Sequence, residues 1–193
     1  MFIQTEDTPN PATLKFLPGR EVLATGLPPI ELEKGDDVST APLAEMLFSI
    51  PNIERVFFGA DFISVSRSNG ADWPRLKPAV LGAIMDFYVA GGDTMHDTMQ
   101  SENASVDEEV YEGDVLEIVE QIKELIETRI RPAVAQDGGD IVFRKFDIRD
   151  GTVTLQMKGA CAGCPSSALT LKSGVENLLR HYVPEVTRVE QAF

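Results

Sequence analysis

An acidic stretch in the middle of the chain limits what this sequence can fold into. Residues 93–114 carry eight acidic and no basic side chains, which is more than half of the net charge of −14. The stretch is also poor in large apolar residues, so it can contribute little to a buried core. We expect an extended, flexible linker, because like charges repel one another along it. The 193 residues are therefore predicted to form two small domains, 1–92 and 115–193.

The first domain, 1–92, mixes strand and helix patterns. Short apolar runs predict strands at residues 2–5, 13–17, 55–58 and 62–66. One helix is predicted to be capped by Ser39 or Thr40 and to end near Phe48, and a longer one to run from Asp72 to about Val89. This segment contains no cysteine and no histidine. It is poorly suited to hold a soft metal, and we expect a role in recognition or in structure.

The sequence pattern of the second domain, 115–193, predicts the element order α-β-β-α-β. An apolar stripe begins a helix at Val115, and Pro132 is expected to end or bend it near Arg131. A turn is predicted at 136–140, before a strand at 141–146. A tight turn at Asp150-Gly151 joins this strand to the next one, 152–157. A helix from 165 or 166 to 181 and a strand at 186–189 follow. Both domains combine helices and strands, so the predicted fold class is α+β.

A Cys-X-X-Cys pair, Cys161 and Cys164, contains the only two cysteines of the chain. Two thiolates supply half of the four ligands that a zinc ion or an iron–sulfur cluster usually needs. If the pair holds metal, the simplest donor of the missing ligands is a second copy of the chain across a two-fold axis. Gly159 and Gly163 permit positive φ around the pair. Pro165 suits the first turn of a helix, which places Cys164 near its positive end and favours the thiolate.

Two other interpretations of the cysteine pair stay open. A zinc ion shared between two chains would suit the same sulfurs. A thiol–disulfide oxidoreductase also has a strand, a Cys-X-X-Cys pair and a helix, but too few residues follow here for a thioredoxin-like fold. His181 lies far along the helix and is interpreted as a surface or partly buried side chain. Ser166 and Ser167 are interpreted as helix caps. Lys158 and Lys172 are interpreted as solvated side chains.

The charge of the chain excludes some classes of partner. A net charge of −14 argues against unspecific nucleic-acid binding and against docking on an anionic membrane. The longest apolar run, 80–90, is too short to span a bilayer and contains Asp86. The first residues lack the features of a signal or transit peptide. We therefore expect a bacterial cytoplasmic protein, with a processed form in the mitochondrial matrix as the alternative.

The sequence closely resembles the NifU-like (Nfu) family. The C-terminal resemblance lies in the cysteine segment 159–176, in 184–186, in Arg131-Pro132 and in the Gln-Asp-Gly-Gly-Asp segment 136–140; the N-terminal one lies in 1–11 and 14–19. The resemblance implies a non-enzymatic scaffold or carrier with no catalytic residue. Such proteins bind a [4Fe–4S] cluster between two subunits and pass it to apo-proteins. The family's ligand cysteines match Cys161 and Cys164.

The resemblance also implies partners. A carrier of this kind forms a homodimer through the cluster, receives the cluster from upstream assembly proteins, and delivers it to apo iron–sulfur clients. The N-terminal domain of the family assists client recognition. Unlike full-length NifU, this chain has no upstream cysteine-rich region, so it resembles the shorter, carrier-type architecture.

Overall fold

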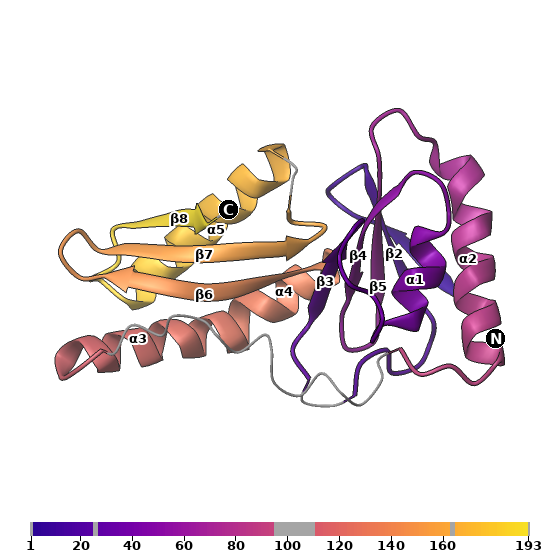
Figure 1. Cartoon of the computed structure of the whole chain (residues 1–193). Helices are drawn as coiled ribbons and strands as arrows, with labels where there is room; N and C mark the ends of the chain where they lie inside the picture. Colours follow the sequence, from indigo (N-terminus) through magenta and orange to yellow (C-terminus); the bar gives the residue numbers. More distant parts are fainter. Residues whose placement is uncertain (1, 25–26, 95–110, 163–164, 193) are drawn as a thin grey trace. The chain divides into compact units, whose positions relative to one another are not determined.

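The computed structural model describes residues 2–24, 27–94, 111–162 and 165–192, with only the backbone described for 165–169 (Figure 1). It divides into two compact units, Met1–Glu102 and Asn103–Phe193, and each has its own apolar core. Most of the predicted acidic linker, residues 95–110, lies outside the described residues. Its flexibility, and domain boundaries at 92 and 115, therefore stay predictions.

The first unit is built on a five-stranded antiparallel sheet. Its strands are β1 (Gln4–Asp7), β2 (Thr13–Leu17), β3 (Ile30–Glu33), β4 (Ile53–Phe58) and β5 (Ile63–Arg67). They lie in the order β1-β2-β5-β4-β3. Three strands were predicted close to their observed bounds, and β1 begins two residues later than expected. Strand β3 was not predicted, because it carries only two apolar residues, follows two prolines and lies at the edge of the sheet.

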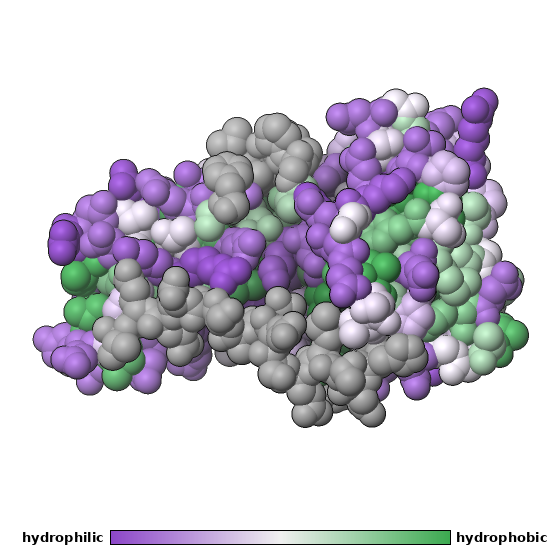
Figure 2. Space-filling model, viewed as in Figure 1, coloured by the Kyte–Doolittle hydropathy of each residue, from purple (hydrophilic) through white to green (hydrophobic). Residues whose placement is uncertain are grey.

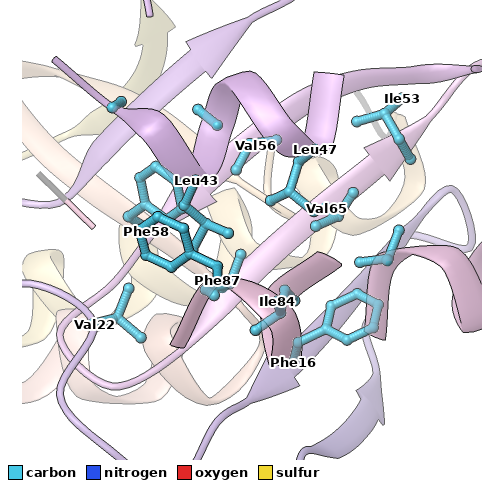
Figure 3. Packing of buried hydrophobic residues seen from close by; sticks show 14 of the residues in the cluster. Phe16, Val22, Leu43, Leu47, Ile53, Val56, Phe58, Val65, Ile84 and Phe87 are labelled. Atoms are coloured by element: carbon cyan, nitrogen blue, oxygen red, sulfur yellow. The ribbon is translucent and has the colours of Figure 1, made fainter. Parts of the chain in front are cut away.

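Two helices, α1 (Pro42–Phe48) and α2 (Trp73–Val89), bury their apolar sides against one face of this sheet. Figure 3 shows Leu43 and Leu47 of α1 and Ile84 of α2 pointing into the same core as side chains from the strands. Alternate residues of a strand face opposite sides of the sheet, which explains which strand side chains reach this core. Leu14 and Phe16 belong to the core cluster, whereas Lys15 between them does not.

The helix caps of the first unit differ from the prediction. Helix α1 begins at Pro42, and its N-cap is Ala41, which makes no side-chain cap hydrogen bond. Ser39 and Thr40 are therefore not the cap. Asp72 does occupy the N-cap of α2, but its side chain makes no cap hydrogen bond either. Proline at the start of both helices compensates in part, because it has no N–H to satisfy and a φ that already suits a helix.

The helical segment of the second unit runs further than Pro132 suggested. Helix α3 (Asp114–Leu125) leads into a π-helical turn, η1 (Ile126–Ile130), and then into α4 (Arg131–Gln136), which has Pro132 in its first turn. The helical segment therefore does not end at Arg131, which was one of the two expected outcomes, and the other, a bend, stays a prediction. Proline has no N–H to donate to the carbonyl four residues back, and its ring crowds that carbonyl. The π turn just before Pro132 is wider than an α-helical turn and makes room for the ring. The Thr128 hydroxyl donates to the Glu124 carbonyl at 2.7 Å within this turn.

A three-stranded sheet forms the rest of the second unit. Strands β6 (Gly139–Asp147) and β7 (Thr152–Gly159) pair antiparallel, and β8 (Arg188–Ala192) lies parallel to β7 after helix α5 (Pro165–Tyr182). The order α-β-β-α-β and the α+β class are confirmed. The strands β6 and β7 are longer than predicted, and β8 begins two residues later. Both predicted turn residues, Asp150 and Gly151, lie in the turn between β6 and β7. Gly151 has a φ of 68° there.

Figure 2 shows hydrophobic surface over the helices of the first unit, where Met46, Met85 and Val89 are exposed. None of the helices in the described ranges combines the length and the apolar composition that a bilayer crossing requires.

Candidate metal centre

Cys161 follows strand β7 by two residues. Gly159 ends that strand with a φ of 65°, as the sequence predicted, and this left-handed conformation turns the chain out of the sheet. The N–H of Ala162 donates to the Gly159 carbonyl at 3.1 Å, which closes a tight turn around Cys161. The second predicted turn residue, Gly163, lies outside the described residues.

The thiol of Cys161 is buried. Its residue is only 6% exposed and packs with the apolar core of the second unit. The backbone of Gly139, at the start of β6, lies against it: a β-carbon placed on Gly139 would be 2.6 Å from the Cys161 Sγ. The sequence pattern predicted the position of Cys161 after a strand, but not that its sulfur would face the start of β6.

Cys164, the other predicted ligand, lies outside the described residues. Helix α5 begins at Pro165, the residue after it, in agreement with the predicted helix start. The side chains of Ser166 and Ser167 are also outside the described part of the chain, so their role as caps stays a prediction. The structure therefore describes the position of Cys161 alone, and the ligand role of both cysteines stays a prediction.

An ion-pair network lies beside the cysteine turn. The Arg131 guanidinium donates to both carboxylate oxygens of Asp140, at 2.7 and 2.9 Å, and to both oxygens of Glu127, at 2.7 and 2.8 Å. Asp140 is only 4% exposed. Its hydrogen bonds are the main reason why the pKa of Arg131 is raised. The network ties the helical segment to the first residues of β6, one position from Gly139.

Sequence reasoning missed the structural importance of Gly139 and Asp140. Both were interpreted as turn residues in the segment 136–140. The left-handed turn residue is Gly138, with a φ of 79°, and Gly139 is not among the residues of positive φ in the described chain. The sequence did offer one sign of the importance of Gly139, because the turn needs a glycine only at Gly138. Asp140 gave none, because an aspartate before an apolar strand is typical of a turn.

The remaining predicted residues lie at the surface or partly buried. His181 is exposed and its ring lies edge-on to Tyr182, with 4.9 Å between ring centres. Lys158 and Lys172 are half-buried. Within the described ranges, no group of three or more His, Cys, Asp and Glu side chains is placed to hold a metal ion. The assignment of Cys161 and Cys164 as ligands stays a prediction.

Comparisons with known proteins match both units. Residues 3–91 match the model described as scaffold protein Nfu/NifU N terminal, and residues 122–190 match the NifU-like domain. A Drosophila erecta protein named "NFU1 iron-sulfur cluster scaffold homolog, mitochondrial" is 49% identical over 193 residues. The chain belongs to the NifU-like (Nfu) family. An Arabidopsis thaliana member named "NifU-like protein 4, mitochondrial" is also 49% identical, over 196 residues.

The similarity to these Nfu relatives covers all of this chain but not all of theirs. The chain spans 65% of the length of the Drosophila protein and 66% of the Arabidopsis protein. A solution structure of a NifU-like protein from Saccharomyces cerevisiae is 26% identical, with a TM-score of 0.47, and the match covers 50% of this chain and 86% of that one. A likeness at that TM-score supports no conclusion.

The relatives correct the predicted compartment. The sequence led us to expect a bacterial cytoplasmic protein, and that expectation was wrong. The relatives from Drosophila and Arabidopsis carry the word mitochondrial in their names, which points to the compartment given as the alternative. The prediction rested on charge and on the lack of targeting features in the first residues, and charge does not distinguish one aqueous compartment from another.

Proposed function

We propose that this Nfu-family protein is a non-enzymatic iron–sulfur cluster scaffold or carrier, acting in the mitochondrion. The observation that supports this proposal most is the cysteine count: the chain has one Cys-X-X-Cys pair and no other cysteine. Thiolates are the soft ligands that iron–sulfur clusters take from proteins. The names of the relatives agree, since the Drosophila protein is called an iron–sulfur cluster scaffold homolog.

The proposed cargo is a [4Fe–4S] cluster held between two copies of the chain by Cys161 and Cys164 of each. One copy contributes half of the thiolates that such a cluster takes, so the pair of copies completes the set. Thiolates of an apo client protein then replace those of the carrier one at a time, and no residue of the carrier has to catalyse a reaction.

The first unit is proposed to bind the client. It has its own core and no cysteine or histidine in residues 1–92, so it is suited to recognition and not to metal binding. The acidic segment 93–114 joins it to the second unit. A tether of this length raises the effective concentration of a bound client near the cluster. Upstream assembly proteins would supply the cluster by the same exchange of ligands.

Anaerobic reconstitution with iron and sulfide tests the ligand assignment. The unaltered chain is expected to bind about four irons per two chains, with a broad charge-transfer absorption band. Cys161→Ala and Cys164→Ala are each expected to abolish stable binding, because too few thiolates remain. His181→Ala, at the far end of helix α5, is the control and is expected to bind iron normally. Full iron binding by Cys161→Ala would refute the proposal, and zinc without colour would favour the shared zinc site.

A further inference from the structure

The thiol of Cys161 occupies a niche whose wall is the backbone of Gly139. A β-carbon on residue 139 would lie 2.6 Å from the Sγ, 3.2 Å from the Cβ of Cys161 and 2.7 Å from the carbonyl oxygen of Lys158. Distances below 3.0 Å do not occur between real β-carbons and their neighbours. Any other amino acid at 139 therefore has to displace the sulfur, the strand or both.

Backbone conformation does not explain the glycine at 139. Gly138 makes the left-handed turn, and Gly139 already pairs with Gly159 in the regular register of β6 and β7. An L-residue could adopt the backbone of a regular strand. The remaining reason for glycine is space, because a β-carbon would collide with the Cys161 Sγ and with the carbonyl oxygen of Lys158.

The start of β6 is fixed from two sides. The next residue, Asp140, is buried and receives two hydrogen bonds from Arg131. On the other side, the N–H of Ala160 donates to the Gly138 carbonyl at 3.1 Å. The wall of the niche is thus attached both to the helical segment and to the cysteine turn itself. A buried, bidentate ion pair of this kind is well suited to fix a backbone position.

We propose that Gly139 is a positioning residue for Cys161, and that the Arg131–Asp140 ion pair holds it in place so that the metal-free chain keeps this thiol shielded from water. The proposal rests on the proposed function in one respect, that Cys161 is a ligand. A sulfur in this niche has to leave it before it can share a cluster with a second copy. The shielded thiol is protected from oxidation and alkylation while the carrier holds no cargo.

Alkylation of the metal-free, full-length chain tests the niche. In a Cys164→Ser background Cys161 is the only thiol. Its reaction with iodoacetamide is expected to be at least about tenfold slower in the folded chain than in urea, because the sulfur must first become exposed. Adding Gly139→Ala is expected to raise the folded-state rate by about tenfold, because the displaced sulfur is exposed without any opening.

Three further variants keep the test decisive. Gly174→Ala is the matched control, since a β-carbon there meets nothing within 4 Å, and it should leave the rate unchanged. Phe146→Leu weakens the core at the other end of β6 and should also leave the rate low. Asp140→Asn adds no atoms near the sulfur. It is expected to raise the rate by about threefold, because the start of β6 is then held less firmly by Arg131. It provides the test if Gly139→Ala does not fold.

Each result of the alkylation test either supports or overturns the proposal. The proposal is overturned if Cys161 of the folded chain reacts as fast as in urea, or if neither Gly139→Ala nor Asp140→Asn increases the rate. It is also overturned if Phe146→Leu increases the rate as much as Gly139→Ala, because general stability would then explain the protection. No iron enters this assay. Failure of the proposed function would instead appear in the reconstitution of the unaltered chain.

Discussion

At the scale of single residues, the ion pair between Arg131 and Asp140 joins the helical segment of the second unit to strand β6. We expect Arg131→Met to lower its free energy of unfolding by about 3 kcal/mol, because a buried carboxylate loses its partner. The double variant Arg131→Met/Asp140→Leu should recover most of that loss, since no charge stays buried. Urea unfolding followed by far-UV circular dichroism measures both. Trp73, the only tryptophan, lies in the first unit. Its fluorescence should therefore report an unchanged unfolding transition of that unit.

Tyr88 gives the first unit a dependence on alkaline pH. Burial raises the pKa of Tyr88 above its ordinary value of 10.0, and its hydroxyl lies 3.0 Å from the Thr94 hydroxyl. The unfolded chain therefore releases this proton at a lower pH than the folded chain does. The resulting stabilisation is complete below about pH 10 and is lost as the pH rises through the folded pKa.

We therefore predict that the stability difference between the unaltered chain and Tyr88→Phe is constant below about pH 10 and shrinks above it. Urea unfolding at a series of pH values, read by Trp73 fluorescence in the same unit, measures this difference. A difference that stays constant well above pH 10 would show that the folded chain ionises Tyr88 as readily as the unfolded chain.

At the scale of elements, the turn between β6 and β7 depends on glycine for two reasons. Gly151 has a φ of 68°, and a β-carbon there would collide with the Glu185 carbonyl. Gly19 of the first unit has a φ of 72° but open space around it. We expect Gly151→Ala to cost about 3 kcal/mol in the unfolding of the second unit and Gly19→Ala only about 1 kcal/mol in the unfolding of the first. Equal losses in urea unfolding would mean that backbone conformation alone explains the glycine at 151.

Most elements of this fold could be predicted from local sequence, because apolar periodicity and turn residues mark them directly. Strand β2 and the end of α2 at Val89 were predicted at their observed positions. Pro132 does not end the helical segment, because a π turn, which no local pattern announces, lets it continue. Strand β3 owes its existence to pairing with β4, and short edge strands with two apolar residues carry little signal of their own.

The candidate site was predictable in its chemistry and not in its packing. The cysteine spacing identified the ligands to test, and Gly159 indicated the turn before them. The niche of Cys161 depends on Gly139, which lies more than twenty positions earlier in the chain and reaches the sulfur only because β6 pairs with β7. Contacts of this kind between strands depend on register, which a single sequence does not fix at one residue.

At the scale of the whole molecule, the two units are expected to behave as separate folding bodies. Each has its own core, and the composition of 93–114 predicts a tether between them. Limited digestion with a glutamate-specific protease should therefore cut first within 93–114 and leave two resistant fragments. Fragment masses identify the cut. A first cut inside either core would contradict the two-domain organisation.

The account depends most on the sharing of one cluster between two copies of the chain. Native mass spectrometry of the anaerobically reconstituted protein measures this directly, because it counts chains, iron and sulfide in the same particle. We predict a particle of two chains with about four irons and four sulfides, and single chains without iron. A single chain that carries a complete cluster, or a pair of chains without iron under strict exclusion of oxygen, would contradict it.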